Sequence, residues 1–333
     1  NRIRPSFERI ERDFFDVDEL TGITRLVREV ATNKTWSFLQ RYFPNEVERP
    51  YNQIRSQFEM KEPKVVWLMS FPNSGTSYTI TNLKDITQKA TATNYMEGDS
   101  TKFKPLFSSQ PDGPYVKEPF YELPEYILTK THCDGYCDLC NQETTRQTLD
   151  SFEIGCASGT RLVKGEKESV SYSSEIPRKA VHLIRNGFDN IVARMHLGIV
   201  KRRKGGWTKG ELSLFNDTSA GLIAWCKHVD ERFQENRQHP LFTEDQKKLL
   251  LQLPCYSEWF RYVQWHNMAI KLIEKLQIPH FTLFYENYTT AFDRTVEGLL
   301  DFMEIKQVRK SKEFIPGKTL SLIHISEPTR RYA

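Results

Sequence analysis

One stretch of the sequence is the most informative about the fold: Val65-Val66-Trp67-Leu68-Met69-Ser70-Phe71-Pro72-Asn73-Ser74-Gly75. Its first five residues form a short, uninterrupted apolar run, which is typical of a strand buried on both faces of a parallel sheet. A turn-like segment with proline and glycine follows, and residues 76–89 can form a helix. The order strand, tight loop and helix predicts the first unit of an α/β fold.

A second unit repeats this order further along the chain. Residues Lys179 to Ile184 are predicted to form a strand, Arg185-Asn186-Gly187 a turn, and Phe188 to Leu197 a helix. A third strand is expected at His280 to Tyr285, followed by an amphipathic helix that ends near Met303. Strands that alternate with helices predict an α/β fold of three layers, with a mostly parallel sheet and helices on both faces.

The remaining segments are predicted to surround this core. Residues 1–60 have helical spacing and predict an N-terminal helical layer. Residues 91–170 and 200–256 are rich in Gly, Pro, Ser and charged residues, and we expect them to form long loops around the opening of a substrate-binding site. A helix is predicted at residues 257–276. Residues 320–330 resemble the translation of a sequencing-library adapter, so residues 320–333 are interpreted as a non-native tail.

Composition excludes several classes of protein. The 333 residues include 21 Phe, 14 Tyr and 6 Trp, too many aromatic side chains for a disordered chain. The net charge of +4 does not indicate a nucleic-acid partner, although it permits a local basic pocket for an anion. No apolar run approaches the roughly 18–20 residues of a membrane-spanning helix. A membrane anchor or signal peptide upstream of Asn1 remains compatible with the sequence.

The cysteines leave several alternatives open. Four of the six, Cys133, Cys137, Cys140 and Cys156, lie within 24 residues. The spacing of the first three matches a radical S-adenosylmethionine iron–sulfur motif; a zinc site with Cys156, a disulfide-stapled loop and free thiols are the other interpretations. Together with the sequons at Asn33, Asn216 and Asn287, the cluster favours an oxidising, secretory compartment. A cytoplasmic location is the alternative.

Three polar segments are predicted to form an anion site. The loop from Ser70 to Tyr78 opens a helix, so its backbone N–H groups and the helix dipole suit a phosphate. It lacks the second glycine and the lysine of a Walker A loop, and the plain alternative is an ordinary N-cap turn. Arg185 follows the second strand and can bind a second phosphate. Lys130-Thr131-His132 supplies a candidate general base, His132.

Together, these segments resemble the sulfotransferases that use 3′-phosphoadenosine 5′-phosphosulfate (PAPS), and the resemblance spans about 240 residues. Phe71 to Tyr78 is similar to the family's 5′-phosphosulfate loop, Tyr-Pro-Lys-Ser-Gly-Thr-Thr-Trp, and His182 to Arg194 to its 3′-phosphate segment. Lys130-Thr131-His132 resembles the catalytic Lys-Thr-His, and Phe284-Tyr285-Glu286-Asn287 the family's Phe-Tyr-Glu-Asp. The resemblance implies a P-loop-like sulfotransferase domain over residues 61–319, with an incomplete C-terminus.

The resemblance also implies a role for each matching residue. The 5′-phosphosulfate of PAPS would be held by the loop residues Asn73, Ser74, Gly75, Thr76 and Ser77. Tyr78 would stack on the adenine, Tyr285 would contact it, and Arg185 would bind the 3′-phosphate. His132 would deprotonate an acceptor hydroxyl while Lys130 neutralises the sulfonate oxygens, and no metal is expected.

Three departures from the family pattern bear on activity. The loop lysine is replaced by Asn73, which can donate a hydrogen bond but carries no charge. The hydroxyl expected eight residues after Arg185 is replaced by Ala193, and the neighbouring Arg194 is expected to be solvated or paired. The family's C-terminal Arg-Lys-Gly segment is absent.

The acceptor is predicted less directly. The basic run from Lys201 to Lys204, followed by Trp207, is either a solvated loop or a surface for an anionic glycan, with Trp207 stacking on a sugar. His196 is interpreted as structural, and Glu286 as a strand-end cap or a brace. The prediction is a sulfotransferase of a Golgi or secretory compartment that acts on a hydroxyl, with carbohydrate favoured over small molecules. The alternatives are a non-catalytic nucleotide- or glycan-binding relative and a P-loop kinase.

Overall fold

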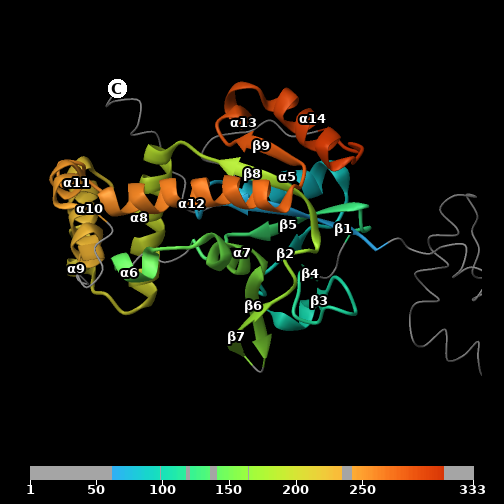
Figure 1. Ribbon diagram of the computed structural model, residues 1–333, viewed down its shortest axis with the longest axis horizontal. Helices are drawn as coiled ribbons and strands as arrows, with labels where there is room; N and C mark the ends of the chain where they lie inside the picture. The colour runs from blue at the N-terminus through green and yellow to red at the C-terminus, as the bar shows by residue number, and fades with distance from the viewer. Residues whose placement is uncertain are drawn as a thin grey trace, which may run out of the picture. The chain divides into compact units, whose positions relative to one another are not determined.

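A computed structural model of the chain describes residues 62–97, 99–117, 121–135, 141–163, 165–234 and 242–310. The predicted helical layer at 1–60 and the adapter-like tail at 320–333 lie outside these residues. The described part contains a seven-stranded sheet in the order β3-β4-β2-β5-β1-β8-β9, viewed in Figure 1. The strands are β1 (Lys64–Ser70), β2 (Ala92–Thr93), β3 (Phe103–Pro105), β4 (Tyr115–Lys117), β5 (Tyr126–Thr131), β8 (Pro177–Ile184) and β9 (His280–Phe284).

The middle of this sheet is parallel, as predicted. β1 pairs in parallel with β5 on one side and with β8 on the other, and β8 pairs in parallel with β9. β2 is parallel to β5, whereas β4 pairs antiparallel with both β2 and β3. The mostly parallel α/β fold expected from the sequence is therefore confirmed, with a short antiparallel edge.

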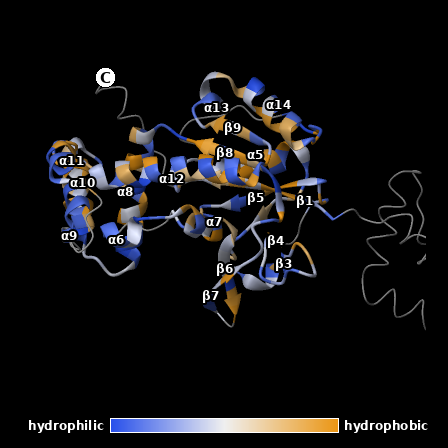
Figure 2. Cartoon of the chain, viewed as in Figure 1, coloured by the Kyte–Doolittle hydropathy of each residue, from blue (hydrophilic) through white to orange (hydrophobic). Residues whose placement is uncertain are grey.

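Alternate residues of β1 contact two different cores. Val65, Trp67 and Met69 pack into a cluster with residues of α7 (Leu149–Ala157) and α12 (Tyr256–Leu276). Val66 and Leu68 pack into a second cluster with α5 (Thr76–Thr87) and α14 (Phe292–Met303). All five side chains are fully buried, which explains why the strand is apolar throughout. In Figure 2, β8 and β9 also contain hydrophobic residues, but mixed with hydrophilic ones.

The segments expected to be irregular contain more regular structure than predicted. Residues 91–170 include η1 (Ser100–Lys102), α6 (Gln142–Thr145) and most of the hairpin β6 (Ser158–Val163) and β7 (Glu166–Ser171), in addition to β2 to β5 and α7. Residues 200–256 include α9 (Lys209–Ser213), α10 (Ser219–Gln234) and α11 (Glu244–Leu250). Of these helices, α10 packs with α8 (Gly187–Lys204) around a third apolar cluster.

The helix α8 is longer than predicted, and this changes the interpretation of the basic run. Lys201, Arg202, Arg203 and Lys204 form the last turn of α8 rather than a loop, where cations interact favourably with the helix dipole. Arg202 is buried, and its guanidinium lies over the ring of Trp207. Two interactions explain why α8 continues beyond residue 197: Ile199 packs against the third apolar cluster, and the basic side chains of the last turn interact with the helix dipole.

Candidate active site

The four motif segments meet at one edge of the sheet. They follow, or end, the neighbouring strands β5, β1, β8 and β9, which are parallel and therefore share a carboxyl edge. Lys130 lies near the end of β5, the loop at residues 71–75 follows β1, Arg185 follows β8, and Tyr285 follows β9. In open α/β sheets this edge is where ligands bind. Residues up to 214 positions apart in the sequence, from Phe71 to Tyr285, are thus brought together.

The loop after β1 leads directly into α5. Gly75 is the N-cap residue and has a left-handed φ of 98°, a conformation that glycine adopts without steric cost. Among the described residues, no side chain caps the first turn of α5, whereas Asn186 caps α8 and Thr148 caps α7. The uncapped N–H groups and the helix dipole together suit an anion.

Asn73 is already engaged with the neighbouring helix. Its amide nitrogen donates to the Ala193 carbonyl of α8 at 2.7 Å, and its own carbonyl accepts from Arg185 Nη1 at 2.8 Å. Asn73 also has a positive φ of 70°, which asparagine tolerates better than most residues. In this structure the Asn73 amide therefore fastens the loop to α8, at the position where the resemblance implies a lysine.

Two aromatic residues and an arginine lie against the start of α5. The Tyr285 ring covers Gly75 so closely that a Cβ added there would lie 2.1 Å from Tyr285 Cδ2. Arg185 stands over the same ring, 5.1 Å from its centre, and Tyr78 makes an edge contact with it. Arg185 Nε is buried and has no hydrogen-bond partner among the described residues. This leaves one guanidinium donor without a protein acceptor beside the loop.

His132 is buried next to the loop, and its tautomer is fixed by its surroundings. Its Nδ1 lies 2.8 Å from the carbonyl oxygen of Ser70. A carbonyl can only accept, so Nδ1 carries the proton and Nε2 of the neutral ring carries the lone pair. Burial lowers the pKa of His132 to about 3, with a further contribution from the charge of Lys130, while the Ser70 carbonyl opposes the shift. The ring is therefore neutral at physiological pH.

Contacts from three sides hold His132 and Lys130 in place. The His132 backbone N–H donates to Tyr95 Oη at 2.9 Å, and its carbonyl accepts from Trp265 Nε1 at 2.9 Å. The Tyr95 ring also stacks on the imidazole. Lys130 Nζ lies 3.4 Å from the exposed carboxylate of Glu97. The imidazole is held by several buried contacts, whereas the Lys130 ammonium lies near the exposed Glu97 carboxylate and over the Tyr95 ring, 5.7 Å from its centre.

A disulfide follows His132 directly. Cys133 is bonded to Cys156, so neither sulfur is available to ligate an iron–sulfur cluster or zinc, and those two alternatives are wrong. The pairing agrees with the interpretation of a stapled loop; Cys137 and Cys140 lie outside the described residues. A second disulfide joins Cys226 to Cys255. No group of three potential metal-ligating side chains occurs in the described ranges.

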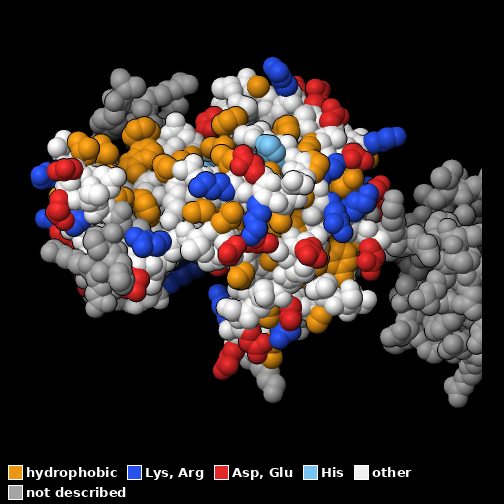
Figure 3. All heavy atoms as spheres, viewed as in Figure 1, with side chains coloured by type: hydrophobic (Ala, Val, Ile, Leu, Met, Phe, Trp, Pro, Cys, Tyr) orange, Lys and Arg blue, Asp and Glu red, His pale blue; other side chains and the backbone are white. Residues whose placement is uncertain are grey.

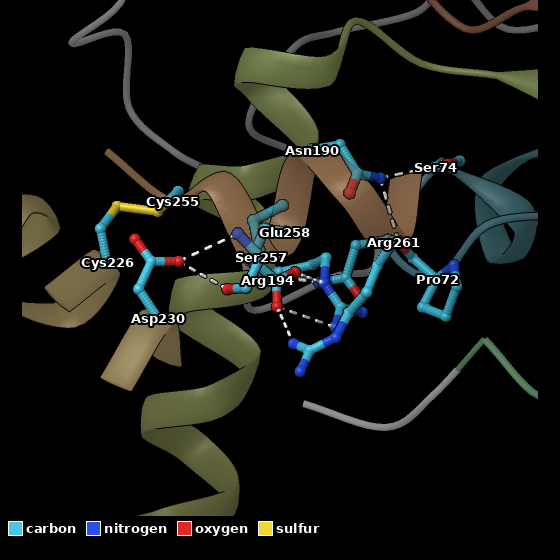
Figure 4. A network of polar contacts seen from close by, with 12 residues as sticks. Pro72, Ser74, Asn190, Arg194, Cys226, Asp230, Cys255, Ser257, Glu258 and Arg261 are labelled. Carbon is cyan, nitrogen blue, oxygen red and sulfur yellow. Dashed lines mark hydrogen bonds and ion pairs between the residues drawn. A yellow bond between two sulfur atoms is a disulfide. The ribbon is translucent and has the colours of Figure 1, made fainter. Parts of the chain in front are cut away.

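A buried polar network behind the loop was not predicted. Glu258 of α12 is fully buried and accepts hydrogen bonds from Arg194 of α8 and, at 2.5 Å, from Arg261. Desolvation raises the pKa of Glu258, but the charges and hydrogen bonds of the two arginines outweigh it, so the net pKa lies below the usual value. Figure 4 shows this network between the Cys226–Cys255 disulfide and the loop residues Pro72 and Ser74.

This network was only partly predictable from the sequence. Glu258 and Arg261 are spaced i, i+3 on a predicted helix, but such pairs are commonly exposed. Arg194 was expected to be solvated or paired, and it is paired, with its side chain turned inward. Asn190, which contacts the loop, lies inside the segment from His182 to Arg194, but the sequence assigned it no role.

The other residues singled out from the sequence have structural contacts. His196 Nε2 lies 3.1 Å from the carboxylate of Asp217. Trp207 packs against Phe215 and His228, which leaves it half-buried rather than freely exposed. Glu286 accepts a hydrogen bond from the Asn186 backbone at 2.8 Å, so it braces the end of β8. On the face in Figure 3, basic side chains are interspersed with acidic ones.

Comparisons with known proteins add little. No protein-family description and no curated protein sequence matches this chain. Among solved structures, it is similar to mouse sulfotransferase SULT7A1 complexed with PAP, with 14% sequence identity and a TM-score of 0.29. The similarity covers 74% of this chain and 61% of the mouse chain, so this chain spans about three fifths of that protein. A TM-score of this size carries no conclusion, and function must be inferred from the chain's own residues.

Proposed function

We propose that the protein transfers a sulfonate group from PAPS to the hydroxyl of an acceptor. The observation that carries this proposal is the convergence of four motif segments at the carboxyl ends of four adjacent parallel strands. An uncapped helix start, a strand-end arginine and a neutral histidine with a defined tautomer occur together there. Sulfonyl transfer needs these three elements: an anion cradle, positive charge and a base.

The donor would occupy the loop and the aromatic residues beside it. The first N–H groups of α5 and the hydroxyls of Ser74 and Ser77 would hold the 5′-phosphosulfate. Arg185 would bind the 3′-phosphate, for which its buried Nε is a suitable donor. Tyr285 and Tyr78, which already contact each other, would pack on the adenine. Because Tyr285 covers Gly75 in this structure, its ring would shift when the nucleotide binds.

The acceptor would react on the side of β5. His132 Nε2 would take the hydroxyl proton, the acceptor oxygen would form a bond to sulfur, and the bond between sulfur and the phosphate oxygen would break. The electron pair leaves with 3′-phosphoadenosine 5′-phosphate (PAP). Lys130 would neutralise the sulfonate oxygens. Since the pKa of His132 is lowered to about 3, the ring is in its base form throughout the neutral range.

For the acceptor and the compartment, we propose a carbohydrate and the lumen of the Golgi or secretory pathway. Two disulfides, Cys133–Cys156 and Cys226–Cys255, support an oxidising environment. The sequon residues Asn216 and Asn287 are both exposed, as glycosylation requires. None of the described helices combines the length and apolar character needed to cross a bilayer.

A second candidate is a protein that binds the nucleotide without catalysis. It is favoured by one observation: the residue at the lysine position is Asn73, whose amide is engaged by the Ala193 carbonyl. Without that positive charge, the leaving phosphate oxygen is stabilised by fewer groups. Tight binding of PAP with no transfer to a broad acceptor panel would support this candidate over the enzyme.

Transfer from sulfur-labelled PAPS to a panel of glycan and small hydroxyl acceptors tests the proposal. His132→Ala should lower turnover by about 100-fold or more, the usual contribution of a positioned base, with PAP affinity within about threefold. His132→Gln retains an amide that can donate to the Ser70 carbonyl but cannot act as the base, and should be equally inactive. His196→Ala is the matched control. His196 contacts the exposed carboxylate of Asp217, so this variant should retain activity. Full turnover in both His132 variants would contradict the assignment.

A further inference from the structure

Asn190 of α8 contacts the loop at two points. Its amide nitrogen donates to the Pro72 carbonyl at 3.0 Å and to Ser74 Oγ at 3.1 Å, as Figure 4 shows. Asn190 and Ser74 are both fully buried. Among the described residues, the Asn190 amide is the sole polar side-chain contact of the Ser74 hydroxyl.

The Pro72 carbonyl fixes which way the Asn190 amide points. A carbonyl only accepts hydrogen bonds, so the NH₂ group must face it; the reverse orientation would place two acceptors in contact. With the NH₂ group also facing Ser74, the serine oxygen accepts, and the proton of its hydroxyl is directed to another acceptor. Asn190 Oδ1 is buried with no partner among the described residues. Because the buried Oδ1 has no such partner, we interpret the Asn190 side chain as retained for the two hydrogen bonds that its NH₂ group donates.

We propose that Asn190 is a positioning residue that turns the Ser74 hydroxyl proton toward the anion bound at the start of α5. This inference rests on the proposed function, in which the loop holds the phosphosulfate end of the nucleotide. Ser74 immediately precedes Gly75, the N-cap of the uncapped helix. A hydroxyl proton directed there adds one donor to the backbone N–H groups.

The helix that carries Asn190 is anchored from behind. One turn further along α8, Arg194 bonds the buried Glu258, which also bonds Arg261. The Asn73 amide donates to the Ala193 carbonyl of the same turn. These contacts hold α8 against the loop, so the Asn190 amide keeps its position relative to Ser74. A rigid second layer of this kind is what holds a binding group at a fixed angle.

A double-mutant cycle on the full chain, with PAP binding measured by calorimetry, tests this inference. We expect Asn190→Ala and Ser74→Ala each to weaken PAP binding by about tenfold, the usual effect of one hydrogen bond to a charged group. The double variant should bind no more weakly than either single variant, because both changes remove the same oriented donor. Asn190→Asp preserves volume but only accepts, so it should capture the serine proton and weaken binding more than Asn190→Ala.

Asn94→Ala is the matched control. Asn94 is also fully buried and also donates from its amide to two oxygens, the carbonyls of Cys156 and Ser158. This change should alter PAP affinity by less than twofold, with folding of all variants checked by circular dichroism. Additive losses from Asn190→Ala and Ser74→Ala, or unchanged affinity in Asn190→Ala and Asn190→Asp, would overturn the inference while leaving the proposed function intact. A wild-type chain that does not bind PAP would overturn both.

Discussion

Replacing Gly75 by alanine tests the geometry of the loop most sharply. The new Cβ would lie 2.1 Å and 2.2 Å from Cδ2 and Cε2 of Tyr285, and the residue would keep a φ of 98°. The left-handed backbone costs about 1–2 kcal/mol for a residue with a Cβ. Displacing the Tyr285 ring costs roughly another 1–3 kcal/mol, as for other overpacked sites. We therefore expect Gly75→Ala to lower the free energy of unfolding by about 2–5 kcal/mol.

Urea unfolding of four chains separates these two contributions. The wild type, Gly75→Ala, Tyr285→Ala and the double variant form a cycle in which the clash exists only in Gly75→Ala. In the Tyr285→Ala background, the glycine change should cost only the backbone contribution, about 1–2 kcal/mol. The coupling free energy should therefore be about 1–3 kcal/mol. Additive effects of the two substitutions would refute the close contact between the ring and the loop.

Two further predictions concern stability. Burial lowers the pKa of His132 and His266 to about 3 and of His182 to about 4. Unfolded histidines bind protons near pH 6.5 and the folded ones do not, so stability should fall as the pH drops from 6.5 toward 4, by up to about 1.4 kcal/mol per pH unit for each. Urea midpoints at pH 7.5 and 5.5 measure this loss, and His266→Gln should reduce it; equal midpoints would contradict it. Replacing Cys226 and Cys255 by alanine opens a loop of 29 residues and should lower the free energy of unfolding by about 3–4 kcal/mol. An unchanged urea midpoint under the same conditions would show that this disulfide does not stabilise the fold.

The first strand of the parallel core was predictable because it is buried on both faces, whereas its neighbour β5 lies within residues 91–170 and was not predicted as a strand. The apolar run from Val65 to Met69 could be recognised without any neighbour, since every residue of β1 from Val65 onward is buried. The strand at 179–184 was predicted from the repeated order of strand, turn and helix, and α14 from its amphipathic spacing. The candidate site followed from the same pattern, because polar residues at the ends of parallel strands lie at one edge.

The remaining features depend on contacts between distant segments. Beyond residue 197, α8 still contributes Ile199 to the apolar cluster that it shares with α10, a contact that local sequence does not reveal. Asn190 and Arg194 lie in the segment from His182 to Arg194, and Glu258 lies in a predicted helix, but only the tertiary packing makes these three residues buried. The Cys226–Cys255 pair has no distinctive spacing. Connectivity of cysteines cannot be deduced from sequence alone.

The most direct test of the central claim is a comparison of PAP with ATP and Mg²⁺ as ligands of the wild-type chain. A ligand at about 100 times its dissociation constant adds roughly 2.7 kcal/mol of stability, which is readily measured as a higher melting temperature. We predict stabilisation by PAP and none by ATP, because the loop lacks a Walker lysine and because we propose that Arg185 binds a 3′-phosphate, which ATP does not have. Stabilisation by ATP with Mg²⁺, or no response to PAP, would contradict the proposed nucleotide site.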